Sequence, residues 1–158
     1  MIKLEIERRW LLKGIPEGLG QPKYEIHQFY GVDEIGNFRV RNCFQIAEKD
    51  YRFYLTRKKF ISEGVFEEDE TEITLHEFSK AFIKCTKGIH KMRYEFLDQN
   101  LKFEIDEVIT RPFIFLEVEL DSIDQSFKMP TFIQDKIIKE ITGNNELSNS
   151  RLSAPLKL

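Results

Sequence analysis

Apolar and polar residues alternate along most of this chain, which is the pattern of strands with one buried and one polar face. In residues 2–10, for example, Ile6 and Trp10 fall on one side of a strand while Glu5, Glu7 and Arg9 fall on the other. The alternation, interrupted by Gly, Pro and Asn turns, predicts eight strands over residues 2–10, 24–30, 38–46, 51–60, 65–73, 89–97, 101–109 and 113–121.

Two segments change to helical spacing. Phe78, Phe82 and Cys85 share one face of a short helix that Thr74 and Glu77 would cap, with Gly88 beyond its end. A second helix is predicted over residues 131–142 from its isoleucines, with Thr131 and Gln134 as the capping box and Gly143 as the stop. The apolar face of this second helix consists of Ile133, Ile137, Ile138 and Ile141.

Strands and helices do not alternate regularly, so a parallel sheet is not expected. The pattern predicts an α+β fold, mainly antiparallel β, either as an open sheet with helices or as a closed barrel. With 158 residues and no composition break, the chain is expected to form one domain over residues 1–158.

Charge narrows the function classes. The chain has 24 Lys and Arg against 27 Asp and Glu, a net charge of −3, so it lacks the basic excess typical of nucleic-acid binding. Only two cysteines occur, Cys43 and Cys85, and their spacing fits neither a metal nor a redox motif. The start is charged from Lys3, and no apolar run approaches the ~20 residues that span a bilayer. We therefore expect a cytoplasmic protein without a membrane or nucleic-acid partner.

The charged residues of the strands are sorted by sign. Glu-x-Glu occurs three times, and Arg-x-Arg or Lys-x-Arg pairs stand on other strands. The cations are Arg9, Arg39, Arg41, Lys58, Lys91 and Arg93, and the anions are Glu5, Glu7, Glu68, Glu70, Glu72, Glu104, Asp106, Glu117 and Glu119.

Two interpretations of these charged faces remain open. They are either the solvated side of an antiparallel sheet, or the lining of a cavity that holds a divalent metal and a polyphosphate together. The second follows because neighbouring carboxylates repel one another unless a cation such as Mg²⁺ or Mn²⁺ lies between them. Paired guanidinium and ammonium groups complement phosphate oxygens.

These motifs, taken in order, resemble the CYTH proteins of the triphosphate tunnel metalloenzyme superfamily. Glu5-Ile6-Glu7-Arg8-Arg9 is similar to the Glu-x-Glu-x-Lys signature that opens the family, although Arg9 replaces the lysine. The resemblance covers nearly the whole chain. It continues through Arg39-Val40-Arg41, Leu55-Thr56-Arg57-Lys58, the Glu68/Glu70/Glu72 run, Lys91-Met92-Arg93-Tyr94, Glu104-Ile105-Asp106, Glu117-Val118-Glu119-Leu120 and Glu140-Ile141-Thr142-Gly143.

The resemblance implies an eight-stranded closed barrel, a triphosphate tunnel with helices packed outside. It also implies the site residues, which we carry over as expectations. Metal-binding residues would be Glu5, Glu7, Glu70, Glu72, Asp106, Glu117 and Glu119. Substrate-binding residues would be Arg39, Arg41, Lys58, Lys91 and Arg93. Catalytic roles would fall to Lys91, Arg9 and Glu117.

The function implied is metal-dependent hydrolysis, with Mg²⁺ or Mn²⁺, of inorganic tripolyphosphate or a small organic triphosphate such as thiamine triphosphate. Two alternatives stay open: a class IV type adenylate cyclase that forms cyclic AMP and pyrophosphate, and a non-catalytic polyphosphate-binding or nucleotide-binding module. Whether the protein forms a homodimer is also open.

The three histidines are not predicted to form a metal site. His27, His76 and His90 lack ligand spacing along the chain, so surface or local hydrogen-bonding roles are expected for them. Trp10 and the phenylalanines are expected to pack on the outer face of the strands.

Overall fold

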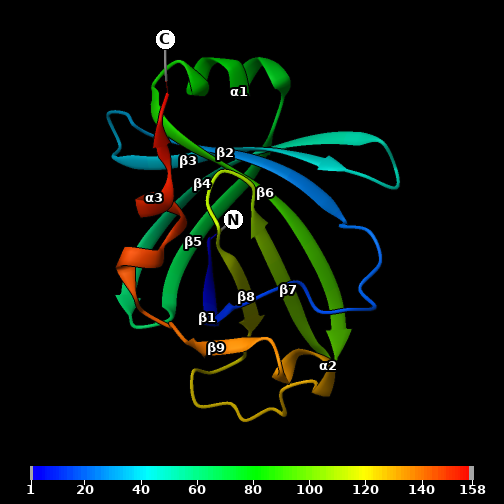
Figure 1. The fold of residues 1–158 in the computed structure, drawn as a ribbon. Helices are drawn as coiled ribbons and strands as arrows, with labels where there is room; N and C mark the ends of the chain where they lie inside the picture. The colour runs from blue at the N-terminus through cyan, green and yellow to red at the C-terminus, as the bar shows by residue number, and fades with distance from the viewer. Residues whose placement is uncertain (1, 157–158) are drawn as a thin grey trace.

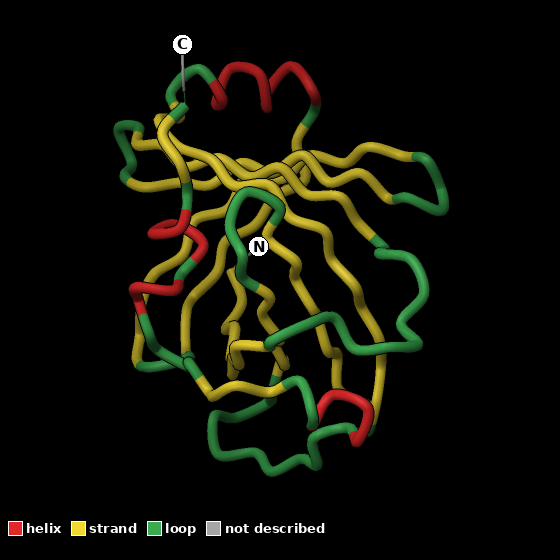
Figure 2. The backbone as a smooth tube through the Cα atoms, in the orientation of Figure 1, coloured by secondary structure: helices red, strands yellow, loops and turns green. Residues whose placement is uncertain are grey.

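Eight antiparallel strands close into a barrel in the computed structural model, which describes residues 2–156 (Figures 1 and 2). Hydrogen bonding runs in the order β6-β2-β3-β4-β5-β1-β8-β7, and pairing between β6 and β7 completes the ring. The strands are β1 (Ile2–Leu12), β2 (Tyr24–Val32), β3 (Asn37–Gln45), β4 (Asp50–Ser62), β5 (Val65–Ile73), β6 (Cys85–Asp98), β7 (Leu101–Val108) and β8 (Ile114–Glu119). The eight predicted strands and the closed barrel of the expected fold class are confirmed.

Alternation along each strand sends one set of side chains into the barrel and the other set outward. Val40 on β3 and Ile105 on β7 are fully buried on the outside, beneath covering segments. The polar set, which includes Arg39 and Arg41, faces inward. The strands are therefore buried on both faces over much of their length.

The first predicted helix is confirmed as α1 (Leu75–Phe82) on the outside of the barrel (Figure 1). The Thr74 side chain accepts a hydrogen bond from the Glu77 backbone N–H, and the Glu77 side chain accepts one from the Thr74 N–H. Phe78 packs against Phe53 on β4, with ring centroids 5.1 Å apart. The helix ends at Phe82, so two parts of the prediction were wrong: Cys85, placed on the helix face, and Gly88, placed as its stop, both lie in β6.

A second apolar layer covers the outer face of β1, β7 and β8. It is supplied by the segment after β8, which includes α2 (Thr131–Gln134). Trp10 of β1 meets Phe127 of this segment edge to face, with centroids 5.7 Å apart. Trp10 thus packs outside the barrel as predicted, against an irregular segment.

The helix predicted over residues 131–142 was wrong in length and in its cap. Only four residues form α2, the N-cap is Pro130 without a side-chain hydrogen bond, and residues Ile137–Glu140 form a strand, β9. β9 pairs with Trp10–Leu12 of β1, beyond the point where β5 pairing with β1 stops at Ile6. The free backbone groups of β1 on that side provide hydrogen bonds that a helix could not take up.

The chain after β9 spans one end of the barrel. A 3₁₀ turn (Asn145–Leu147) and α3 (Asn149–Leu152) lead to β10 (Ala154–Pro155), which pairs with Lys87 and Gly88 of β6. Leu147 and Leu152 pack with Ile89 and Phe115 in one apolar cluster. The tail therefore connects β1 to β6 and caps this end of the interior. No helix within residues 2–156 is long and apolar enough to cross a bilayer.

Candidate active site in the barrel interior

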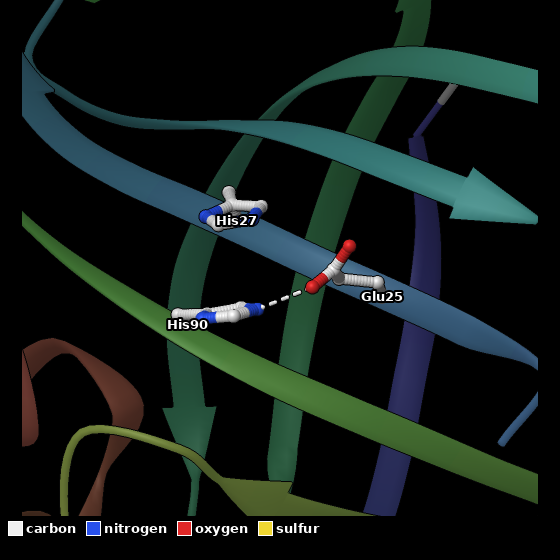
Figure 3. Close-up of side chains that lie close together, drawn as sticks. All are labelled: Glu25, His27 and His90. Atoms are coloured by element: carbon white, nitrogen blue, oxygen red, sulfur yellow. Dashed lines mark hydrogen bonds and ion pairs between the residues drawn. The ribbon is translucent and has the colours of Figure 1, made fainter.

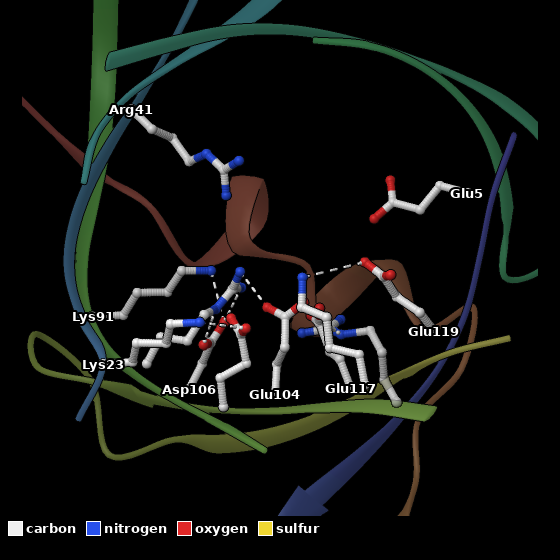
Figure 4. Close-up of polar contacts among 12 residues, drawn as sticks. Glu5, Lys23, Arg41, Lys91, Glu104, Asp106, Glu117 and Glu119 are labelled. Carbon is white, nitrogen blue, oxygen red and sulfur yellow. Dashed lines mark hydrogen bonds and ion pairs between the residues drawn. The ribbon is translucent and has the colours of Figure 1, made fainter. Parts of the chain in front are cut away.

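The barrel encloses a cavity of about 640 Å³ whose lining is dominated by charged side chains. Figure 4 shows Arg41 and Lys91 pointing inward from one side and Glu5 and Glu119 from the other. The acidic lining residues are Glu5, Glu7, Glu68, Glu70, Glu104, Glu117 and Glu119. The basic ones are Lys3, Arg9, Arg39, Arg41, Lys58, Lys87, Lys91, Arg93 and Lys102.

Three arginines of the cavity lining have hydrogen-bond donors without a partner within residues 2–156. Among the described residues, Arg9 Nη2, Arg39 Nε and Arg41 Nε are buried without a hydrogen-bond partner. Arg41 Nη2 donates to Glu70 Oε2 at 2.8 Å, so each guanidinium is only partly satisfied by the protein. Buried donors without acceptors are costly, and phosphate oxygens match the guanidinium group in charge and geometry. This wall is suited to bind an oxyanion.

Below the basic wall, Asp106 on β7 holds two cations of β6. Lys91 Nζ donates to Asp106 Oδ2 at 2.8 Å, and Arg93 donates to both oxygens of Asp106 at 2.7 and 2.8 Å. Lys91 is 1% exposed and Asp106 1% exposed. Burial, with repulsion from Arg93, lowers the pKa of Lys91 to about 8 although Asp106 opposes the shift. Asp106 thereby orients both basic side chains toward the cavity.

On the opposite wall, strand register brings carboxylates face to face. Glu7 of β1 lies directly across from Glu119 of β8, and Glu117 of β8 lies across from Glu104 of β7. Like charges in directly opposed positions destabilise a sheet. Burial and the repulsion of Glu117 raise the pKa of Glu7 to about 8. Such crowded carboxylate oxygens form a donor set that fits Mg²⁺ or Mn²⁺.

Glu5 and Glu68 share a hydrogen bond, and their pKa values are shifted in opposite directions. Burial works to raise the pKa of Glu5, but Lys58 at 2.8 Å, the hydrogen bond with Glu68 and the charge of Arg39 together outweigh burial and lower the pKa to about 2. Burial, together with hydrogen bonding to Glu5, raises the pKa of Glu68 to about 7. At neutral pH this corner of the cavity holds an ionised Glu5, a charged Lys58 and a partly protonated Glu68.

Arg9 links the acidic wall to the tail. Its Nε donates to Glu117 Oε1 at 3.0 Å, and its Nη1 donates to the Leu147 carbonyl at 3.2 Å. The guanidinium lies over the Phe115 ring, 4.7 Å from its centroid. These contacts orient Arg9 beside the carboxylates and leave Nη2 as its free donor.

Similar folds were found among solved structures. The inorganic triphosphatase NE1496 superposes with a TM-score of 0.57 over 94% of this chain and 96% of its own, at 22% identity. The chain has a CYTH-type tunnel fold. A hypothetical protein from Pyrococcus furiosus gives a TM-score of 0.53 at 18% identity, covering 83% of this chain and 84% of that protein. The PH1819 protein from Pyrococcus horikoshii gives 0.54 at 17% identity, covering 83% of this chain and 82% of that protein.

At these identities the match establishes the tunnel fold, and the activity of this chain rests on its own residues. No protein-family model and no curated protein matches the sequence.

The tunnel gathers most of the residues named from the sequence. Its wall carries the predicted side chains Glu5, Glu7, Arg9, Arg39, Arg41, Lys58, Glu70, Lys91, Arg93, Glu117 and Glu119. Two others stand elsewhere. Glu72 is exposed near the end of β5 and forms an ion pair with Arg52 at 3.4 Å, and Asp106 lies behind the wall with both oxygens engaged by Lys91 and Arg93.

Sequence reasoning did not assign several other tunnel residues to the site. Glu68 and Lys102 lie on the inward faces of β5 and β7, and each stands two positions from an inward-facing glutamate, which was the available signal. Asn145, Ser148 and Ser150 enter from the tail, for which the sequence offered no period to read. Glu68 was named among the charged residues but given no role at the site, although it shares hydrogen bonding with Glu5.

Proposed function

We propose that residues 1–158 act as a single CYTH domain that binds a linear triphosphate with Mg²⁺ or Mn²⁺ and hydrolyses a phosphoanhydride bond. One observation carries the proposal. The same cavity contains guanidinium donors without acceptors, on Arg9, Arg39 and Arg41, and carboxylates that lie directly opposite one another on paired strands. A polyphosphate would satisfy the donors and a divalent cation the carboxylates, so the two ligands together would complete the site.

The phosphate chain is bound by Arg39, Arg41, Lys58 and Arg93, with Lys91 at the terminal phosphate. Whereas a surface lysine would be flexible, the hydrogen bond to Asp106 fixes the position of the Lys91 ammonium group. Its lowered pKa, about 8, makes it able to give a proton to an oxygen or take one from it near neutral pH. These fixed charges stabilise the negative charge that develops on the transferred phosphoryl group.

The metal ligands are Glu5, Glu7, Glu117 and Glu119, which come from the two paired strands β1 and β8. When bound, the divalent cation supplies neutralisation of the phosphate oxygens and a Lewis acid for the reaction. Glu117 has a second task, since it also holds Arg9 at 3.0 Å. Arg9 retains the charge of the lysine in the family signature, and its free Nη2 can donate to a phosphate oxygen.

A substrate panel tests the proposal. Tripolyphosphate, thiamine triphosphate and ATP are incubated with Mg²⁺ or Mn²⁺, and phosphate, pyrophosphate and cyclic AMP are measured. Release of phosphate from tripolyphosphate or thiamine triphosphate is expected. Cyclic AMP with pyrophosphate from ATP would instead indicate a cyclase, and binding without any product would indicate a binding module.

Variants locate the reaction. Glu117→Gln and Lys91→Ala are expected to lower kcat about 10²- to 10³-fold, because each removes a fixed charge beside the reacting phosphate. Glu72→Gln is the matched control, since Glu72 lies outside the tunnel lining and pairs with the exposed Arg52. Unchanged rates in both tunnel variants, with circular dichroism showing a native fold, would refute the assignment of the site.

A further inference from the structure

Two histidines and a glutamate meet on the outer face of the barrel, away from the tunnel. Glu25 and His27 lie on β2, and His90 lies opposite His27 on β6 (Figure 3). The neighbour of His90 in the chain, Lys91, points into the tunnel, so His90 points outward. The histidines are 63 positions apart in sequence, and only the β2–β6 pairing brings them together.

The cluster is compact. The imidazole rings stack with centroids 4.0 Å apart and planes 12° apart. His90 Nε2 lies 2.9 Å from Glu25 Oε2, and one ligand atom from each of the three side chains falls within 4.8 Å of the others. A tetrahedral metal with ligand distances of about 2.0–2.2 Å holds its donors roughly 3.4 Å apart, so binding would draw the three side chains closer together.

We propose that Glu25, His27 and His90 bind Zn²⁺ on the outer face of the barrel, at a site separate from the tunnel. Two imidazole nitrogens and one carboxylate oxygen are a donor set that suits zinc. The tunnel offers carboxylate oxygens only, a set that suits Mg²⁺ or Mn²⁺. The two sites therefore differ in the metal they select.

The surroundings of His27 support a ligand there. The His27 ring forms no hydrogen bond with any residue of 2–156, whereas His90 Nε2 is hydrogen-bonded to Glu25. Asn42 of β3 is the cross-strand neighbour of His27 on the same face, and its Oδ1 is buried without a hydrogen-bond partner. This oxygen can accept a hydrogen bond from the ring N–H of His27, which would fix the ring as a zinc-bound histidine requires.

Binding a metal at this cluster would require both imidazole rings in their neutral form and the Glu25 carboxylate in its ionised form. A bound ion would join β2 to β6, two strands that are far apart in sequence. Zinc at about 100 times its Kd is expected to raise the Tm by about 5–10 °C.

The test is a Zn²⁺ titration of the full chain in excess Mg²⁺, which keeps the tunnel carboxylates occupied. The expected result is one Zn²⁺ per chain, an increase in Tm, and shifts of the ring ¹⁵N resonances of His27 and His90 at one equivalent. His27→Gln and His90→Gln are expected to weaken zinc binding at least 100-fold. His76→Gln, on the exposed face of α1, and the tunnel variant Glu117→Gln are expected to bind zinc as the wild type does.

Several results would overturn the proposal. Zinc binding that survives in His27→Gln and His90→Gln places the ion elsewhere, and zinc binding lost in Glu117→Gln places it in the tunnel. If the histidine variants do not fold, the ring ¹⁵N shifts of the wild-type protein decide: unshifted rings at one equivalent reject the site. None of these measurements depends on triphosphate turnover, so the site and the proposed hydrolase activity stand or fall separately.

Discussion

Replacing Asp106 by Asn removes the one carboxylate that holds both Lys91 and Arg93. The Lys91 and Asp106 side chains are almost fully buried and that of Arg93 is 12% exposed, and Asp106 accepts three hydrogen bonds of 2.7 to 2.8 Å from the two cations. Removing one partner of a buried ion pair leaves an uncompensated charge and costs about 3–5 kcal/mol. For a chain of this length that loss corresponds to a decrease in Tm of roughly 6–20 °C.

The loss should depend on pH in a defined direction. In the wild type the pKa of Lys91 is already lowered to about 8, and without Asp106 it is expected to fall further. The folded variant then binds fewer protons than the unfolded chain below pH 8, so its free energy of unfolding rises relative to wild type as pH increases. The difference between variant and wild type should therefore shrink from pH 6 to pH 8.

Urea unfolding at several pH values measures this difference directly. Asp50→Asn is the matched control, because Asp50 forms an ion pair with Arg52 on the exposed surface and should leave the unfolding midpoint unchanged. Tripolyphosphate is expected to recover part of the loss in Asp106→Asn by supplying negative charge to the same two cations. A loss below about 1 kcal/mol, or one that grows with pH, would refute the account of the buried triad.

Four further outcomes are expected. Because the pKa of Glu7 is raised to about 8, Mg²⁺ binding should release a proton. Mg²⁺ affinity measured by calorimetry should therefore rise by up to about tenfold per pH unit from pH 6 to pH 8. An affinity that does not change with pH would contradict this. Without metal, the stabilisation from protonated Glu7 is complete below pH 4.5 and is lost as pH rises through 8. Burial raises the pKa of Cys85 to about 11, so Ellman's reagent at pH 8 should react with it only on unfolding, and rapid reaction in the native state would show an open site. Gly64→Ala should destabilise more than Gly18→Ala in thermal unfolding: both glycines have positive φ, but only at Gly64 would the new Cβ lie 2.7 Å from the Glu7 carbonyl oxygen. Equal losses would mean that the close approach to β1 carries no cost.

The strands were predictable because apolar and polar residues alternate along most of them, with charged residues gathered on the inward faces. The segment over residues 131–142 broke that regularity. Ile133, Ile137 and Ile141 have helical spacing, but the β-branched run from Ile137 also suits a strand, and the unpaired edge of β1 beyond Ile6 decided between the two. That edge exists only once the barrel has formed, so no local sequence pattern predicts the pairing of residues 137–140 with it.

The set of inward-facing charged residues was largely predictable, and their depth along each strand was less so. Alternation identified the inward faces, yet the position along the strand decides whether a side chain reaches the cavity, and Glu72 stands too near the end of β5. Nor could the sequence show that Asp106 is fully engaged by its own cross-strand neighbours. His27 and His90 meet through a long-range strand pairing that their spacing does not reveal.

Ion pairs along the tunnel wall are expected to make the two proposed ligands cooperative. Glu5 is held by Lys58 at 2.8 Å, and Glu70 is held by Arg41 at 2.8 Å. A cation that takes Glu5 frees Lys58 for a phosphate, and a phosphate that takes Arg41 frees the carboxylate of Glu70. Since coupling between two ligands is reciprocal, metal and triphosphate are each expected to strengthen the binding of the other.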